Sequence, residues 1–134
     1  MIDIFNEVFT QTATALRAKF KGIRVTGEYV QTPVSYPAVA LDEIDNIETE
    51  ADSSDRERYN IVRYRVQVFS NKSSGKRAEA RSIQKEIDLI FKSMGFKRTS
   101  YSTTPDIINN TVYCITTVFS AVVDENGYIH GTEI

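Results

Sequence analysis

The sequence predicts an α+β domain in which a mainly antiparallel sheet of four or five strands carries two helices on one face. Two long segments have the 3.6-residue apolar repeat of helices, and several others alternate with the two-residue period of strands. The connections between them are mainly short, and the element order is α-β-β-β-α-β-β, which favours antiparallel pairing. At 134 residues the chain is expected to form one domain over 1–134.

The first helix is predicted to begin after Asp3, whose carboxylate can cap it, and to end near Gly22. Its apolar side is built from residues with helical spacing, which are Phe5, Val8, Phe9, Thr12, Leu16 and Phe20. A short strand is expected over 24–30. An extended connection bracketed by Pro33 and Pro37 follows it.

A second strand is expected over 38–47, before a highly charged segment at 48–58. Such a segment gains little stability from burial, so it predicts a mobile loop. The alternative is that the second strand extends into it as a projecting hairpin. Its charged residues are Glu48, Glu50, Asp52, Asp55, Arg56, Glu57 and Arg58.

The third strand and the second helix give the strongest signal. The strand places Val62, Tyr64, Val66 and Val68 on one face and Arg63, Arg65 and Gln67 on the other. The helix carries an apolar stripe made of Ala80, Ile83, Ile87, Ile90, Phe91 and Met94. Gly95 is expected to adopt the left-handed conformation that ends the helix, with Phe96 folding back onto Phe91 in a Schellman motif.

A strand is expected over 96–102, a turn over 103–106 and the longest strand over 111–124. One face of this last strand holds Val112, Cys114, Thr116, Val118 and Val122. The other holds Tyr113, Ile115, Phe119 and Val123. Apolar residues on both faces predict a central strand, or one whose second face, the Tyr113 set, meets something other than the core. Residues 124–127 are expected to turn into a short final strand at 128–130.

Composition excludes several classes of function. The formal charge of −2 argues against a dedicated nucleic-acid binder, and no apolar run is long enough to cross a membrane. The N-terminus does not have the pattern of a secretory signal. The single cysteine, Cys114, cannot form an internal disulfide, which fits a reducing compartment such as a cytoplasm.

No motif for catalysis or cofactor binding is evident. Residues 73–77 (SSGKR) do not form a Walker loop, because Ser70 stands where its first glycine is needed and Arg77 where it needs Ser or Thr. His130 is the single histidine and lies near the C-terminus, so it and Cys114 are expected to be structural. The carboxylates of 48–58 do not follow a calcium-loop pattern. We therefore expect no enzyme activity, no cofactor, no metal and no catalytic residue.

Several segments, in this order and spacing, resemble the tail terminator (tail completion) proteins of long-tailed siphophages. They are the N-terminal helix, residues 32–39 (TPVSYPAV), 64–70 (YRVQVFS), 76–80 (KRAEA) and 94–98 (MGFKR), and the late strand that ends at Val123. The resemblance runs along nearly the whole chain. It rests on no catalytic fingerprint and transfers no residue roles.

The resemblance implies a non-enzymatic virion protein that caps the tail tube as a hexameric ring, stops tail elongation and forms the head–tail joining surface. The implied partners are other copies of the chain, the major tail tube protein and a head-completion or connector protein, with DNA passing through the ring without specific binding. In such a ring the charged residues of 48–58 are candidates for an assembly or lumen-lining loop. The face that holds Tyr113, Ile115, Phe119 and Val123 is the candidate subunit interface. The protein would be assembled in the host cytoplasm and reside at the head-proximal end of the tail. Another neck or minor capsid component and, less favoured, a small ligand-binding domain remain alternatives.

Overall fold

The computed structural model describes residues 1–51, 57–105 and 111–131. It is an α+β fold with two helices and a five-stranded, mostly antiparallel sheet, which confirms the predicted class and element order. The helices are α1 (Phe5–Lys19) and α2 (Lys76–Met94). The strands are β1 (Arg24–Thr26), β2 (Ala38–Ala51), β3 (Glu57–Ser70), β4 (Lys97–Pro105) and β5 (Tyr113–Asp124).

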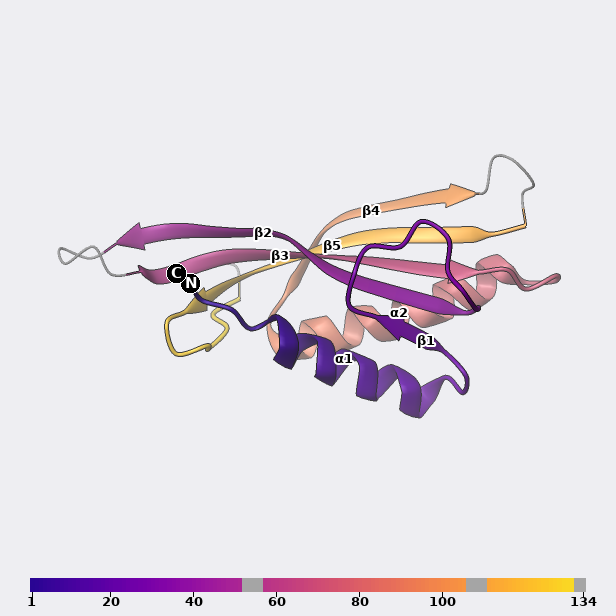
Figure 1. The fold of residues 1–134 in the computed structure, drawn as a ribbon, viewed down its shortest axis with the longest axis horizontal. Helices are drawn as coiled ribbons and strands as arrows, with labels where there is room; N and C mark the ends of the chain where they lie inside the picture. Colours follow the sequence, from indigo (N-terminus) through magenta and orange to yellow (C-terminus); the bar gives the residue numbers. More distant parts are fainter. Residues whose placement is uncertain (52–56, 106–110, 132–134) are drawn as a thin grey trace.

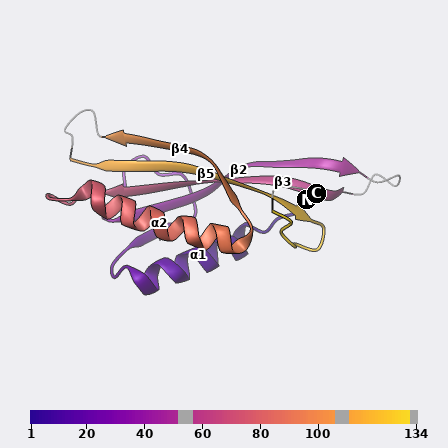
Figure 2. The same ribbon diagram turned by 180° about the vertical axis from the view of Figure 1, so that it is seen from behind.

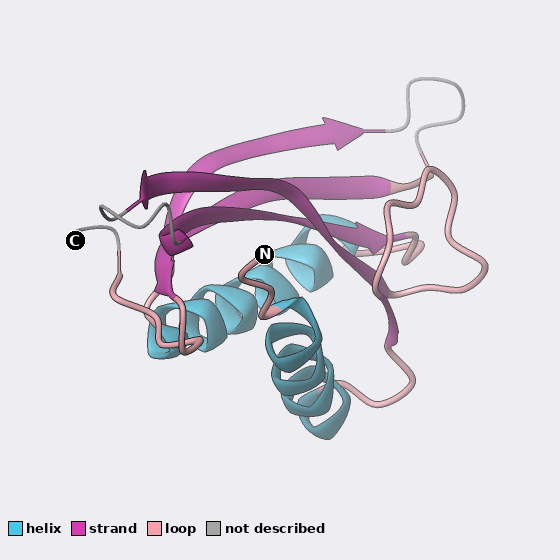
Figure 3. Cartoon of the chain, turned by 60° about the vertical axis from the view of Figure 1, so that its left-hand side comes forward, coloured by secondary structure: helices cyan, strands magenta, loops and turns pink. Residues whose placement is uncertain are grey.

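The strands lie in the order β1-β2-β3-β5-β4, which the sequence did not predict. β1 pairs in parallel with the first three residues of β2, and every other pairing is antiparallel. Both helices lie on the same side of the sheet (Figures 1, 2 and 3). We call the other side of the sheet the open face. β4 forms one edge of the sheet, and β2 beyond Ala40 forms much of the other.

The core fills the space between the helices and one face of the sheet. The predicted apolar face of β3 lies entirely within it, since Val62, Tyr64, Val66 and Val68 are fully buried. Phe91 of α2 stacks on Phe119 of β5 with ring centroids 4.4 Å apart. Burying such aromatic rings contributes strongly to stability, so α2 is held mainly by this contact layer.

The predicted end of α2 is confirmed, whereas α1 begins at Phe5 with Ile4 as its N-cap and ends at Lys19. The Asp3 carboxylate accepts a hydrogen bond from the Phe5 amide at 3.0 Å. Gly95 has φ of 100°, the Phe96 amide donates to the Phe91 carbonyl at 2.9 Å, and the two phenyl rings meet edge to face. These are the bonds and the apolar contact of a Schellman motif, and they turn the chain directly from α2 into β4.

Several predicted boundaries are wrong. β1 ends at Thr26, directly before Gly27. The proposed loop over 48–58 is largely paired strand: β2 continues to Ala51 and β3 begins at Glu57, so the projecting-hairpin alternative is the correct one, and residues 52–56 lie outside the described part. β4 runs to Pro105 through the predicted turn, because its backbone pairs with β5 there. Cross-strand pairing provides the stability that these polar segments cannot gain from burial alone.

The Ile83→Asp variant is expected to unfold. Ile83 is fully buried in the stripe of α2, and an unpaired carboxylate there costs several kcal/mol against a total stability of about 5–15 kcal/mol. Thermal denaturation followed by circular dichroism measures the effect. The matched control is Leu89→Asp in the same helix, where the side chain is 62% exposed and little change is expected. A native melting temperature for Ile83→Asp would show that this face is not core.

Candidate assembly surface

The open face of the sheet is covered at one end only. There the segment 27–37 folds over it, and Val30 and Tyr36 pack against a small cluster formed by Ala38, Ala40 and Phe69. Further along β2 and β3 the open face carries charged side chains and exposed apolar ones, including Ile47, which is 45% exposed. This part of the sheet is therefore available for contact with another protein.

Two cross-strand ion pairs order the middle of the open face. Arg65 binds Asp42 through two hydrogen bonds, Nε to Oδ1 at 3.0 Å and Nη2 to Oδ2 at 2.6 Å, and its guanidinium lies 4.5 Å from the centroid of the Tyr29 ring. Hydrogen bonding to Asp42 raises the pKa of Arg65, which keeps it charged. Arg63 binds Asp45 at 3.1 Å. The sequence predicted the face of both arginines but not their partners.

A polar cluster lies on the helix side of the same two strands, where β2 bulges after Glu43. The Asn46 amide donates to the Ile2 carbonyl at 2.7 Å and accepts a hydrogen bond from Asn60, so the N-terminal segment is fixed to the hairpin. Burial raises the pKa of Glu43, and the nearby Asp3 carboxylate raises it further. Burial likewise raises the pKa of Tyr64, which pairs with Glu43 across the strands.

The second face of β5 is not the free surface that the sequence suggested. Ile115, Phe119 and Val123 are all buried in the core under the helices, and Tyr113 packs against the same core. The assignment of this face as a subunit interface is therefore corrected. Its alternation was predicted correctly, but sequence alone did not say which of the two apolar faces the helices cover. The face of β5 that remains open is the opposite one, which includes Thr116 and Val118.

The candidate assembly residues belong to a long hairpin. Glu48 and Glu50 lie on β2, and Glu57 and Arg58 on β3. Asp52, Asp55 and Arg56 lie outside the described residues. The hairpin extends past both helices, so its far half has no helical layer beneath it (Figure 1).

A hollow of about 330 Å³ lies between the 27–37 segment and the open face. Its lining is a mixture of aromatic, aliphatic and polar side chains, among them Tyr29, Tyr36, Gln67, Phe69, Cys114 and Thr116. The Gln67 side-chain oxygen accepts a hydrogen bond from the Val30 amide at 3.3 Å, which ties the segment to the sheet. Burial raises the pKa of the Cys114 thiol, which disfavours the reactive thiolate.

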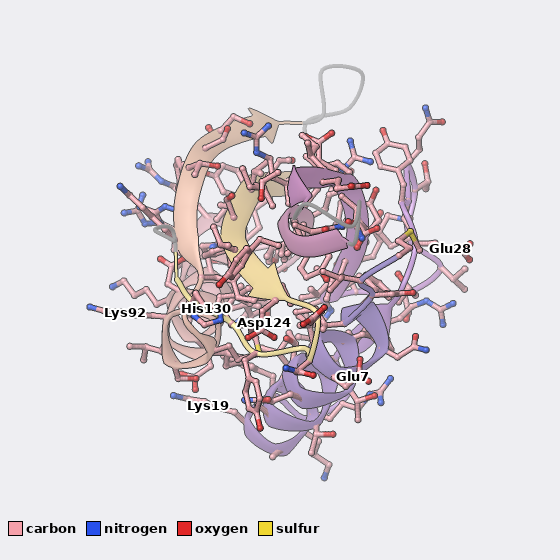
Figure 4. The ribbon with its side chains drawn as sticks, turned by 90° about the vertical axis from the view of Figure 1, so that its left-hand side faces the viewer. Glu7, Lys19, Glu28, Lys92, Asp124 and His130 are labelled. Atoms are coloured by element: carbon pink, nitrogen blue, oxygen red, sulfur yellow. The ribbon has the colours of Figure 1, made fainter. Side chains whose placement is uncertain are left out.

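His130 and Cys114 do not form a catalytic pair. The His130 imidazole Nε2 lies 2.7 Å from Asp124 Oδ2, and the other carboxylate oxygen accepts from the Asn126 and Tyr128 amides (Figure 4). The hydrogen bond with His130 lowers the pKa of Asp124. His130 is anchored beside Val122, eight residues along β5 from Cys114, which is roughly 25 Å. The arrangement fixes the turn after β5.

A second groove, which the sequence did not predict, runs between α2 and β4. Its volume is about 390 Å³, and its lining residues are Arg81, Gln84, Lys85, Asp88, Arg98 and Tyr101. Arg98 binds Asp88 at 2.7 Å and lies against the Tyr101 ring. The helical spacing of Arg81, Lys85 and Asp88 was visible in the sequence. The position of Arg98 beside them could not be predicted, because the sequence does not give the strand order that places β4 there.

Within the described residues, no helix is long and apolar enough to cross a membrane, and no group of three or more His, Cys, Asp or Glu side chains is placed to hold a metal ion. No protein-family model matches the sequence, and no curated protein matches it. The surfaces of the fold are thus the basis for inferring a function.

The Glu43→Gln variant is expected to gain stability relative to the wild type as pH rises. Folding raises the pKa of the Glu43 carboxyl above its ordinary value of 4.5. The wild type therefore loses stability as the pH rises from this ordinary pKa through the raised pKa of the folded state. The amide cannot ionise, so the difference in melting temperature should grow between about pH 4 and pH 7. Thermal melts across this range measure it, with Glu48→Gln as an exposed control on the same strand. Parallel curves for Glu43→Gln and wild type would contradict the burial of this carboxyl.

Proposed function

We propose that this chain is a non-enzymatic structural protein of a phage virion, a tail terminator that caps the tail tube as a hexameric ring. The observation that carries the proposal is the half-covered sheet with a hairpin extending past the helices. A ring subunit needs two different contact surfaces, one for each neighbour. A sheet with one open face, two distinct edges and a projecting hairpin offers such surfaces without further elements.

The ordered charge on the open face supports an assembly role. Exposed ion pairs such as Arg63–Asp45 add little to the stability of a monomer, so they are not needed to hold the fold. At a protein interface the same charges set orientation and exclude wrong partners. The resemblance to siphophage tail terminators supplies the identity of the assembly, and the proposed partners are further copies of the chain, the major tail tube protein and a head-completion protein.

Deleting the gene from the phage that encodes the chain is expected to give filled heads unattached to tails, together with tails of abnormal length. The reason is that a ring that ends tube growth also supplies the joining surface. Electron microscopy of lysates measures both effects, and supplying the wild-type gene in trans should restore joined particles. Heads that leak DNA beside tails of normal length would instead assign the chain to head closure.

The hollow under the 27–37 segment favours a second candidate, a small-ligand-binding domain. Its volume lies at the lower end of the range of about 300–1,000 Å³ for such sites, and the Gln67 amide lies among aromatic walls. This candidate predicts that a small neutral aromatic amide, such as nicotinamide, produces saturable NMR shifts at Tyr29 and Thr116. Thr116→Trp, which fills the hollow, should abolish them. Shifts that stay linear with concentration would remove this candidate.

A further inference from the structure

The edge strand β2 is acidic, and the segment that contains α2 is basic. Residues 42–51 of β2 contain five Asp or Glu and no Lys or Arg. Residues 71–98, which form α2 and the start of the other edge strand, contain eight Lys or Arg and three Asp or Glu. The strand order places β2 and β4 on opposite sides of β3 and β5, and α2 packs beneath β3 and β5 with further contacts to β4 (Figures 1 and 2). The acidic strand β2 thus lies at the edge away from β4.

The cations of the α2–β4 groove are only partly neutralised. Arg98 is paired with Asp88, but Arg81 and Lys85 are exposed and form no ion pair with any residue that the structure describes. The groove thus has an excess of positive charge, and the Tyr101 ring provides an apolar wall. Such a surface fits an acidic polypeptide segment.

Gln84 is the most deeply buried residue of the groove lining. The residue is only 3% exposed, and its side-chain nitrogen donates to Asp88 Oδ1 at 2.9 Å. Its side-chain oxygen is buried and accepts no hydrogen bond from the described part of the chain. A buried acceptor without a donor is costly, so this amide is the least satisfied polar group of the groove lining.

We propose that copies of this chain associate head to tail, with the far end of β2 of one copy lying in the α2–β4 groove of the next. This inference depends on the proposed ring and specifies the interface between its subunits. Glu48, which is exposed near the far end of β2, brings negative charge to Arg81 and Lys85. No described strand pairs with the outer side of β2 beyond Ala40, so this edge can approach a neighbouring copy.

This contact has the geometry that a ring requires. The far end of β2 and the α2–β4 groove are different patches on opposite sides of one subunit. Each copy can therefore use both patches, one for each neighbour, and all copies are equivalent. Contacts of this kind close into a ring when the rotation between neighbours completes a circle. A two-fold dimer would need a self-complementary patch, and two acidic edges would repel each other.

Disulfide trapping tests the contact in the full-length chain with Cys114→Ser as background. Glu48→Cys in one preparation and Lys85→Cys in another are mixed under mild oxidation, and formation of the heterodimer is followed on non-reducing gels. The control mixture replaces Lys85→Cys by Lys21→Cys, an exposed position that follows α1. We expect crosslinking on the order of tenfold faster than in the control, and slower at about 0.5 M salt, where charges are screened.

Charge-reversal variants provide a second test of the contact in the same crosslinking assay. In the same background, Arg81→Glu with Lys85→Cys should lose the fast crosslink to Glu48→Cys, because the groove no longer attracts an acidic edge. Adding Glu50→Lys to the Glu48→Cys chain should restore it. Equal rates for the test and control mixtures, or no effect of Arg81→Glu, would overturn the proposed contact. Tight binding of duplex DNA that is lost in Arg81→Glu/Lys85→Glu, without fast crosslinking, would assign the groove to phosphate instead.

The outcomes separate this contact from the proposed function. Fast crosslinking together with normal head–tail joining in the deletion phage would uphold the contact and reject the tail terminator. Unjoined heads and abnormal tails in the deletion, with crosslinking equal to the control, would uphold the tail terminator and reject the contact.

Discussion

The packing of α2 against a single face of the sheet is the constraint on which the other features of this protein depend. Phe91 and Phe96 bring the helix and its Schellman turn onto Tyr64 and Phe119, and the alternation of β3 and β5 determines which side chains enter that layer. Because both helices cover this face, the opposite face receives the Arg65–Asp42 and Arg63–Asp45 ion pairs of β2 and β3. The one-sided core thus creates the open surface, the two edges and the hairpin past the helices.

The same arrangement explains how assembly can be conditional. Exposed ion pairs and a narrow edge contact give a small favourable free energy, which does not offset the entropy lost when subunits associate from dilute solution. The end of a tail tube would hold neighbouring subunits in register and raise their effective concentration, so that weak contacts add up. A subunit of this kind would form only transient contacts in dilute solution and would close a ring when a tube end is present. Such behaviour would suit the proposed tail terminator, which acts once per tail.

The sequence predicted the elements that depend on local periodicity and turn chemistry. The stripe of α2, the Gly95–Phe96 ending and the buried face of β3 are all present, because each is determined by residues close together in the chain. The face of β5 covered by helices, the extension of β2 to Ala51 and the groove beside Arg98 depend on which strands become neighbours. Strand order comes from long-range pairing, which a local apolar pattern does not encode.

A cryo-electron microscopy map of the head–tail junction of the virion tests the central claim most directly. The account predicts one ring of this chain at the head-proximal end of the tail tube, with the β2–β3 hairpin of each copy against α2 and β4 of its neighbour. Density for the chain within the head connector, or absence of the chain from the virion, would contradict the assignment as a tail terminator.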